Sequence, residues 1–311
     1  MGRIAILGVF VADTTFRAER QPRMGETLLG ESFTLGPGGK GSNQAVAAGR
    51  AGAKVHFVSR IGRDAFGDMA MRIWEEAGVT PAVARVEEAT GAAFIFIEAG
   101  SGDNAIIIAP GAAGGLSAAD VEARADVIAG ASVFVTQLEQ PMEAAMAGLR
   151  IARGGGAATI LNPAPAAELP AGMLALCDYV TPNETEAEML SGVAVRDLSS
   201  ARAAGDALLA LGVAKAVIVT LGSKGALYHD ADRSVSIPAF HEGDVVETTG
   251  AGDAFNGAFA TALAEGRDPV EAARFACAAA AISVTRPGAA ASMASRAEIE
   301  ALLARGPGTQ A

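Results

Sequence analysis

The sequence has few cysteines and no apolar run long enough to span a bilayer. Cys177 and Cys277 are the two cysteines among 311 residues, and they lack the spacing of metal ligands. This usage is typical of a reducing compartment and not of a disulfide framework. The run 275–284 is too short to cross a membrane, and we interpret the apolar run 4–12 as a buried first strand and not as a signal peptide. We therefore expect a cytoplasmic protein with no membrane partner.

Basic residues are also scarce. The chain has 24 Lys and Arg against 35 Asp and Glu, a formal net charge of −11. A surface this acidic repels phosphate backbones, so we expect no nucleic-acid partner. An anionic small substrate would need its own local pocket of basic groups or backbone amides.

Half of the residues are hydrophobic and 19% are charged, a globular composition with enough material for a large core. Short β-branched runs alternate with helical periodicity, which predicts an α/β fold: a three-layer, mostly parallel sheet with helices on both faces, in a single domain over 1–311. Ser117 with Asp120 and Ser295 with Glu298 are typical helix starts. The predicted strands are 4–8, 55–60, 133–136, 159–161 and 217–220, and the predicted helices are 43–51, 65–77, 117–128, 142–153 and 201–211.

Two stretches break this alternation. Residues 27–35 and 81–108 carry strand signals without an intervening helix, and 92–98 and 104–108 are joined by a glycine-rich turn. We predict that segments from about 14–35 and 81–110 form a small antiparallel β lid inserted in the domain. It could cover a site or join two subunits, and a plain surface hairpin is the alternative.

The strongest chemical signal is the stretch 247–257, in which glycines crowd before a helix that continues through Ala264. A helix start presents free N–H groups to a phosphate, and Gly250 and Gly252 allow close approach of the backbone. Asp253, in the first turn, could accept a proton from an attacking alcohol. The alternative is a tight loop in which Asp253 interacts only with the helix dipole.

A second glycine-rich stretch, 36–43, fits the dinucleotide pattern only formally. The next strand ends in Arg60 where a ribose-binding acid is expected, so only an NADP-type site could be argued. The Walker A pattern also fails, because Gly41 follows Lys40. We prefer a turn that brings the backbone and Asn43 against a polyol, and a simple strand-to-helix turn remains open.

Two further motifs are less specific. Asn183 and Glu186 have the spacing of a helix cap, or could lie near a hydrated magnesium ion. Thr220 ends a predicted strand and runs into a glycine turn, at the sheet edge where α/β proteins bind ligands.

Taken in this order, the segments resemble the ribokinase-like (PfkB-type) carbohydrate kinases from about residue 4 to 303. The stretches 37–50 and 248–255 are similar to the two family signatures, and 161–166 and 181–188 are similar to the ribose-phosphorylating branch. The resemblance implies transfer of the γ-phosphate of ATP to a sugar hydroxyl, D-ribose to ribose 5-phosphate in the first instance, with Mg²⁺ accompanying ATP, K⁺ as an activator and a homodimer formed through the β lid.

The resemblance also implies roles for individual residues. Asp253 matches the catalytic base, and Gly250, Ala251 and Gly252 match the anion hole. The sugar-binding positions are Val11, Asp13, Gly39, Lys40, Asn43, Glu139 and Asp253. The ATP-binding positions are Asn183, Thr220, Gly222, Ser223, Gly225, Gly252 and Cys277. Glu186 matches a residue linked to Mg²⁺ through water, and the monovalent-cation positions are Glu247, Thr249, Ser283, Arg286, Gly288 and Ser292.

Three residues depart from the family pattern. Val11 stands where an asparagine is usual, which removes a polar contact to the sugar. Glu247 replaces an aspartate of the cation site, and Cys277 replaces a histidine near the nucleotide. The alternatives are a kinase of another pentose, a ketohexose or a nucleoside; a non-catalytic sugar or nucleotide sensor on the same fold; and an NADP-dependent oxidoreductase.

Overall fold

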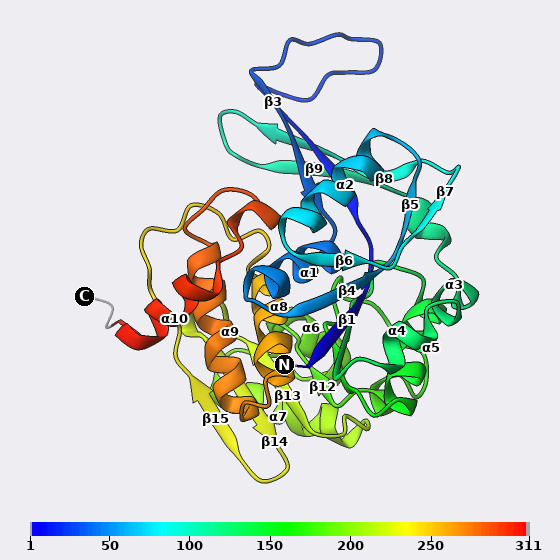
Figure 1. Ribbon diagram of the computed structural model, residues 1–311. Coiled ribbons are helices and arrows are strands. Elements are labelled where there is room, and N and C mark those ends of the chain that lie inside the picture. The colour runs from blue at the N-terminus through cyan, green and yellow to red at the C-terminus, as the bar shows by residue number, and fades with distance from the viewer. Residues whose placement is uncertain (1, 309–311) are drawn as a thin grey trace.

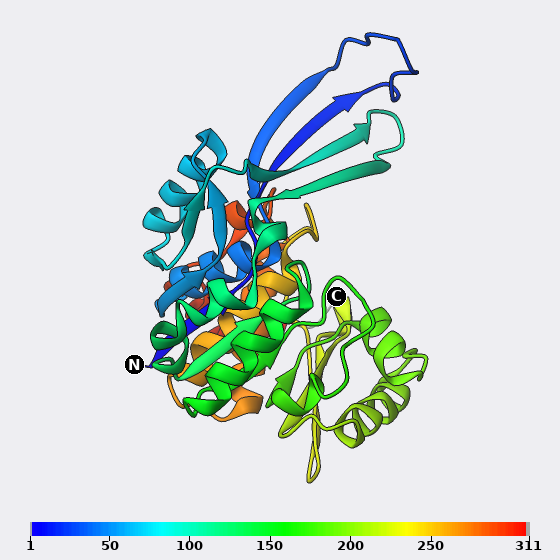
Figure 2. The same ribbon diagram turned by 90° about the vertical axis from the view of Figure 1, so that its right-hand side faces the viewer.

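The computed structural model describes residues 2–308, and it shows an α/β body from which a smaller sheet projects (Figures 1 and 2). Residue 1 and residues 309–311 of the predicted domain lie outside the described part. The fold class is as predicted, and the assignment of one domain to 1–311 stays a prediction.

Within residues 2–308, nine strands form the central sheet in the order β15-β14-β13-β12-β11-β10-β1-β4-β6. Every neighbouring pair from β13 to β6 is parallel, and β14 and β15 add antiparallel strands at one edge. The strands are β1 (Arg3–Leu7), β4 (Lys54–Val58), β6 (Val79–Pro81), β10 (Val133–Thr136), β11 (Ala158–Leu161), β12 (Tyr179–Val180), β13 (Ala216–Thr220), β14 (Ala226–Asp230) and β15 (Ser234–Ile237). The carboxyl ends of the parallel strands share one edge, where such sheets bind ligands.

Helices cover both faces of the sheet, and alternation along the strands divides the core accordingly (Figure 2). In β1, Ile4 and Ile6 belong to one buried cluster, and Ala5 and Leu7 belong to the other. The first cluster is covered by α1 (Lys40–Arg50), α2 (Ala65–Glu76), α8 (Ala251–Ala264), α9 (Pro269–Ser283) and α10 (Arg296–Arg305). The second is covered by α3 (Ala118–Glu122), α4 (Ala125–Ala129), α5 (Met142–Gly154), α6 (Glu184–Ser191) and α7 (Leu198–Ala210). The 3₁₀ turns are η1 (Ala112–Gly115), η2 (Leu174–Leu176), η3 (Gly222–Lys224) and η4 (Ala290–Ser292).

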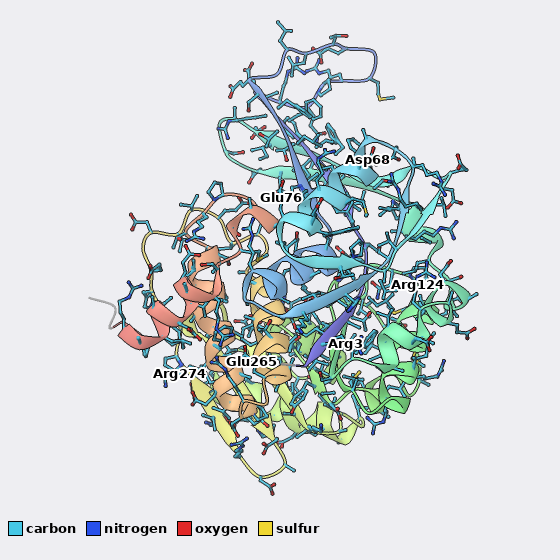
Figure 3. All side chains as sticks on the ribbon, viewed as in Figure 1. Arg3, Asp68, Glu76, Arg124, Glu265 and Arg274 are labelled. Carbon is cyan, nitrogen blue, oxygen red and sulfur yellow. The ribbon has the colours of Figure 1, made fainter. Side chains whose placement is uncertain are left out.

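Helix α2 illustrates how the sequence pattern gives this packing. Trp74 is fully buried, with its ring 5.8 Å from that of Phe10, whereas Asp68 and Glu76 lie on the outer side (Figure 3). The Asp64 side chain caps the helix by accepting from Gly67 N over 2.8 Å. One apolar stripe and one cap therefore fix this helix on the sheet.

The smaller sheet, which we call the lid, has the strand order β3-β2-β8-β9. It projects from the body in both views (Figures 1 and 2). Two antiparallel hairpins, β2–β3 and β8–β9, join through the parallel pair β2–β8. The lid strands are β2 (Val11–Ala18), β3 (Ser32–Gly38), β8 (Thr90–Glu98) and β9 (Asn104–Gly111), and a separate short pair is formed by β5 (Arg60–Gly62) and β7 (Ala84–Val86).

Two local predictions were wrong. The strand predicted for 27–35 begins only at Ser32, because β2 ends at Ala18 and Arg17 to Ser32 is the last pair of this ladder. The helix predicted for 117–128 is broken into α3 and α4 at Arg124, which has a φ of −119°. The Arg124 guanidinium donates to the carbonyl of Ala82 on the neighbouring segment.

The predicted helix starts are confirmed. Ser117 with Asp120 and Ser295 with Glu298 form capping boxes, in which each side chain bonds the backbone N–H of the other residue. Among residues 2–308, no helix is long and apolar enough to cross a membrane.

Candidate active site

A polar cavity of about 210 Å³ lies at the carboxyl edge of the central sheet. Strand ends and the start of α8 contribute its walls. Its lining residues are Lys40, Asn162, Ala164, Thr181, Asn183, Glu186, Thr220, Thr248, Gly250, Gly252, Asp253 and Asn256. Segments more than 200 residues apart in sequence thus meet around one small space.

The start of α8 supplies free backbone donors to this cavity. Gly250 is the N-cap residue with φ of +81°, a left-handed conformation that glycine adopts without strain. Ala251 N donates to Thr248 O over 3.2 Å, whereas the N–H groups of Gly252 and Asp253 have no acceptor among the described residues. Gly250 N has no acceptor there either, so the helix start favours negative charge, and the anion hole predicted at Gly250, Ala251 and Gly252 stays a prediction.

Asp253 lies at the base of this cavity and is 6% exposed. Asn43 Nδ2 donates to its Oδ2 and Gln44 Nε2 donates to its Oδ1, both over 3.0 Å. Burial raises the pKa of Asp253, and the positive charge of Lys40 and the two amides oppose that rise. Each oxygen keeps a further lone pair, so the carboxylate can still accept a proton.

The turn before α1 positions the other predicted sugar-binding residues. Gly39 has φ of +87°, and a Cβ there would stand 2.5 Å from the carbonyl oxygen of Val9. The turn points Lys40 N at Glu139 Oε2, over 2.7 Å. A Cβ on Gly38 would meet the Asp13 carboxylate at 2.3 Å, so only glycine leaves room for Asp13.

Carboxylates outnumber cations around the site. Burial raises the pKa of Asp13 to about 6 and that of Glu139 to about 7. Contact with Lys40 opposes the rise at Glu139, whereas the negative charges of Asp253 and Asp13 add to it. These carboxyl groups are therefore destabilised in their ionised form until a ligand or a cation satisfies them.

Replacing Glu139 with glutamine should stabilise the unliganded protein at pH 8. Because the pKa of Glu139 rises on folding, its stabilising contribution is complete below about pH 4.5 and is lost as the pH rises through about 7. Glu139→Gln removes this loss, since its amide oxygen can still accept from Lys40 N. We expect about 1–3 kcal/mol more stability at pH 8, and a gain that shrinks to nothing near pH 4.5.

Denaturant unfolding between pH 4.5 and pH 8 measures this gain. Glu143→Gln, at an exposed glutamate in the first turn of α5, controls for the loss of one negative charge. A constant difference between Glu139→Gln and the parent protein at every pH would show that the ionisation of Glu139 is not destabilising.

Asn183 and Glu186 take the helix-cap role that the sequence allowed, and their link to magnesium stays a prediction. They form a capping box, with Asn183 N donating to Glu186 Oε2 over 2.9 Å and Glu186 N donating to Asn183 Oδ1 over 2.8 Å. Both residues also line the cavity. Burial raises the pKa of Glu186, and its second carboxylate oxygen stays available to a cation or to water.

The other predicted nucleotide residues are less closely grouped. Thr220 lines the cavity and bridges to Asn183, whereas Gly222, Ser223 and Gly225 form the turn beyond it. Gly225 has φ of +94°, and a Cβ there would clash with the carbonyl of Ile237. Cys277 is buried in α9 outside the cavity lining, and burial raises the pKa of its thiol to about 12. Their nucleotide contacts stay predictions.

The predicted cation-binding positions come from two segments that lie side by side. Val246 N and Glu247 N both donate to Val284 O, and Glu247 Oε2 accepts from Gly288 N over 2.8 Å. Ser283, Ser292 and Arg286 have local partners, which are Ala280 O, Ala289 O and Glu298. Thr249 lies between Glu247 and the Gly250 cap. Among residues 2–308, no group of three or more His, Cys, Asp or Glu side chains could hold a metal ion.

The sequence reasoning missed a row of buried amide and hydroxyl groups beneath Asp253. Gln137, Asn162 and Thr181 directly follow β10, β11 and β12, and Gln44 follows Asn43 in α1. Asn162 Nδ2 donates to Thr181 O, and Thr181 Oγ1 donates to Asn256 Oδ1 over 2.7 Å. For Gln137, Asn162 and Thr181 a signal was present, because each is a polar residue immediately after a buried parallel strand.

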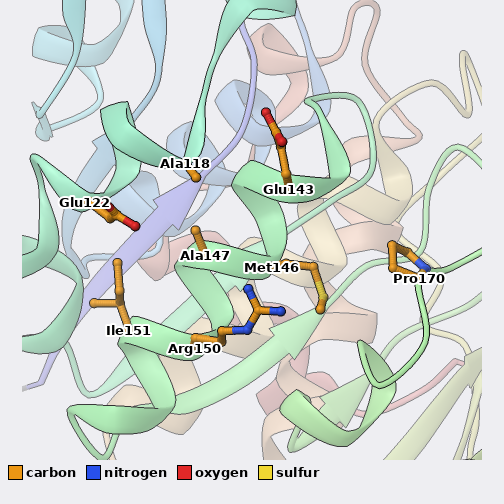
Figure 4. A pocket seen from close by; sticks show the side chains of 8 residues that line it. All are labelled: Ala118, Glu122, Glu143, Met146, Ala147, Arg150, Ile151 and Pro170. Carbon is orange, nitrogen blue, oxygen red and sulfur yellow. The ribbon is translucent and has the colours of Figure 1, made fainter.

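A larger pocket of about 430 Å³ lies between α3 and α5, away from these residues (Figure 4). Its walls mix apolar and charged side chains from helix surfaces, and include Met146, Ile151, Glu143 and Arg150. It contains none of the predicted site residues, so size alone does not identify the active site.

Comparison with known proteins gives a consistent result. The model of the pfkB family of carbohydrate kinases matches residues 1–296. The chain is 42% identical over 297 residues to a ribokinase of Haemophilus influenzae, covering 95% of this chain and 96% of that protein. It is 38% identical over 288 residues to a deoxyribokinase of Salmonella typhi, covering 92% of this chain and 93% of that protein.

A solved structure shows the same architecture. The ribokinase of Arabidopsis thaliana, complexed with ribose and ATP, superposes with a TM-score of 0.90 at 31% identity. The match covers 97% of this chain and 98% of that one.

Proposed function

The chain belongs to the pfkB family of carbohydrate kinases, and on that premise we propose that it transfers the γ-phosphate of ATP to the 5-hydroxyl of ribose. The observation that carries this proposal is the start of α8, where a buried carboxylate shares a cavity with free backbone N–H groups. A proton acceptor and a phosphate-binding site side by side are what phosphoryl transfer to an alcohol requires.

ATP would lie along the carboxyl edge of the sheet, with its phosphates in the cavity bounded by Asn183, Thr220 and Gly252. Its γ-phosphate would accept hydrogen bonds from Gly252 N and Asp253 N. These amides are fixed by the helix before the reaction begins, so they stabilise the charge of the transferring group without reorganisation. Lys40, which also lines the cavity, adds positive charge.

The sugar would lie beside Asp253, within reach of Asp13, Asn43 and Glu139. Carboxylates accept directional hydrogen bonds from hydroxyl groups, and the unpartnered, buried Oδ1 of Asn43 has the same capacity. A hydroxyl held against Asp253 would lose its proton to the carboxylate as its oxygen attacks the γ-phosphorus in line. Positioning and charge stabilisation supply most of the rate in such reactions.

The acidic cavity suits Mg²⁺ bound together with ATP. Glu186 offers a buried carboxylate with one free oxygen, and Asp253 and Asn183 line the same space. Magnesium typically binds one or two carboxylates, waters and substrate phosphates, and it would neutralise phosphate charge here. Glu186 would orient a water of that ion, and the capping box would hold Glu186 in place.

The segments around Glu247 and Gly288 would hold a monovalent cation, K⁺ by preference, mostly through backbone carbonyls. Support comes from the tie between Glu247 Oε2 and Gly288 N, which brings the two segments together next to the Gly250 cap. Turnover measured in K⁺ should exceed turnover in a tetramethylammonium salt at equal ionic strength. Equal turnover in the two salts would show that no K⁺ site at these segments contributes to the reaction.

The lid would both cover the sugar and join two subunits. Asp13 is on one face of the lid, turned to the site. The opposite face carries exposed apolar side chains, and the ring centroids of Phe16 and Phe33 are 4.9 Å apart. This face consists of Phe16, Phe33, Leu35, Phe94 and Ile107. An exposed apolar surface of this kind marks an interaction site, and sedimentation equilibrium should find a dimer that Phe33→Ser dissociates.

A second candidate acceptor is 2-deoxyribose, and one residue of the chain favours it. Val11 lies two residues before Asp13 on the same face of β2 and is buried, so an apolar group stands where the family resemblance implies an asparagine. Restoring the amide with Val11→Asn should raise kcat/KM for ribose relative to 2-deoxyribose by roughly 3- to 10-fold, the value of about one hydrogen bond.

The ratio of the two kcat/KM values, measured with each sugar at saturating ATP, checks this expectation. Val11→Leu controls for a change of side-chain volume without a new polar group. If the ratio of kcat/KM for ribose to kcat/KM for 2-deoxyribose is the same in Val11→Asn and Val11→Leu, the residue at this position does not distinguish the two sugars by a hydrogen bond.

The experiment for the whole proposal is ADP formation with ATP and Mg²⁺ across a panel of acceptors: ribose, 2-deoxyribose, another pentose, a ketohexose and a nucleoside. We expect ribose to be among the best. Binding of ATP or sugar without ADP formation would favour the non-catalytic sensor. NADPH binding, detected by a change in nicotinamide fluorescence, would favour the oxidoreductase.

A further inference from the structure

The carboxylate of Asp253 is held by two consecutive residues of α1, of which the proposed mechanism uses only Asn43. The second is Gln44, which donates to Asp253 Oδ1 over 3.0 Å from a fully buried side chain. Neither Gln44 nor Asn43 is part of the cavity lining, and both contact the base directly. The contacts of Gln44 differ from those of Asn43 in a way that indicates its role.

Gln44 has no N–H donor left for a substrate, and its side chain is fully buried. Its amide nitrogen donates to both Asp253 Oδ1 and Asn162 Oδ1, and its Oε1 accepts from Gln137 Nε2 over 2.5 Å. Asn43, by contrast, has an Oδ1 that is buried without a partner. Asn43 can therefore accept from a sugar hydroxyl, whereas the fully buried Gln44 uses both of its donors on protein groups.

The orientation of the Gln44 amide is fixed from both sides. Asn162 Nδ2 donates to Thr181 O, which can only accept, so Asn162 Oδ1 must face Gln44. On the other side, the Asp253 carboxylate can only accept, so Gln44 Nε2 faces Asp253 and Asn162. Gln44 Oε1 then faces Gln137, whose Nε2 donates to it, while Gln137 Oε1 is buried without a partner.

We propose that Gln44 is a positioning residue for the general base, which orients Asp253 and stabilises its ionised form while making no contact with substrate. This inference rests on the proposed kinase function. With Oδ1 held by Gln44 and Oδ2 by Asn43, the carboxylate cannot rotate, and its remaining lone pairs have a fixed direction. A group that must receive a proton in a defined geometry gains from such support.

The charges around Asp253 show why its ionised form needs the hydrogen bond from Gln44. Lys40 favours the anion, whereas Glu139 and Glu186 are negative groups close enough for Asp253 to raise their pKa. Burial also raises the pKa of Asp253 itself. Removing one amide donor should raise it further, because a hydrogen bond to the ionised form favours that form.

Gln44→Met tests the proposal, because methionine has a similar volume and no donor. We expect kcat for ribose to fall roughly 10- to 100-fold while KM for ribose stays within about 2-fold, since a misoriented base affects the chemical step and not sugar binding. The acid limb of the kcat–pH profile should move to higher pH. Loss of stability alone would not produce that shift.

Thr261→Val is the matched control. Thr261 is fully buried in α8, the helix of Asp253, and bonds Gly257 O at a distance from the site. It should lose stability and keep the parental kcat and pH profile. If Gln44→Met has the same kinetics and profile as Thr261→Val, the proposal is overturned.

Two further outcomes remain distinguishable. If Gln44→Met does not fold, Gln137→Met, which removes the group that orients Gln44, should show a smaller loss of kcat and the same shift of the acid limb. An unchanged profile in that variant would overturn the proposal. If the parent protein itself does not phosphorylate ribose with ATP and Mg²⁺, the proposed function fails, and the inference fails with it.

Discussion

Asp253→Asn is expected to fold like the parent protein and to lose about 10²- to 10⁴-fold or more in turnover, the usual contribution of a general base. The amide cannot take the proton of the sugar hydroxyl. Its NH₂ group also faces one of the two amide donors, Asn43 or Gln44, so one hydrogen bond is lost. That loss is offset because a buried negative charge is removed, and the melting temperature should change little.

Turnover with saturating ATP and ribose, compared at equal folded fraction, checks this prediction. ATP affinity should be retained or slightly increased, since less negative charge remains near the γ-phosphate. A turnover within a few-fold of the parent would remove Asp253 from the role of base.

Gly252→Ala is the second change with a large expected effect. A Cβ at this position meets no heavy atom within 4 Å, and Gly252 itself lines the cavity. The fold should tolerate it, and alanine favours the helix by up to about 1 kcal/mol. The methyl group would hold the phosphate away from the N–H groups of Gly252 and Asp253, so we expect kcat/KM for ATP to fall about 10²- to 10³-fold, as for loss of an oxyanion donor.

Gly154→Ala, at the end of α5, is the matched control, because a Cβ there also meets nothing within 4 Å. It should leave activity unchanged. Gly250→Ala should behave differently from both, since φ is +81° and its Cβ would stand 3.0 Å from Ala289, so it should lose stability as well as activity. If Gly252→Ala keeps parental kinetics, the phosphate does not lie at the start of α8.

The central sheet could be predicted from the sequence because its strands are short, β-branched and bounded by turns. The segment 133–136 was placed correctly at both ends for this reason. Where tertiary contacts decide, prediction failed. Thr27, Leu28 and Leu29 gave the strand signal here, but no neighbouring strand extends far enough to pair with them. Helix 117–128 has good periodicity but is interrupted at Arg124, which bonds another segment.

The candidate site likewise divides into residues that a local sequence pattern reveals and residues whose contacts exist only in the folded chain. Asp253 and its glycines could be found, because a glycine-rich helix start with an acid in its first turn is a local pattern. Gln137 and Asn162 gave only a weak signal, as single polar residues after buried strands, and Gln44 gave none, because it lies inside α1. Their importance depends on two strand ends and helix α1 converging at one carboxylate. The pairing of Asn43 with Asp253, 210 residues apart, likewise exists only in the folded chain.

The central claim is best tested by following the reaction itself by ³¹P and ¹³C NMR, with the full chain, ATP, Mg²⁺ and ribose. The account predicts that ADP and a phosphomonoester appear in equal amounts, that the phosphorus couples to carbon 5 of ribose, and that Asp253→Asn suppresses the signal. ADP with free phosphate and unmodified sugar, or phosphate on another oxygen of ribose, would contradict it.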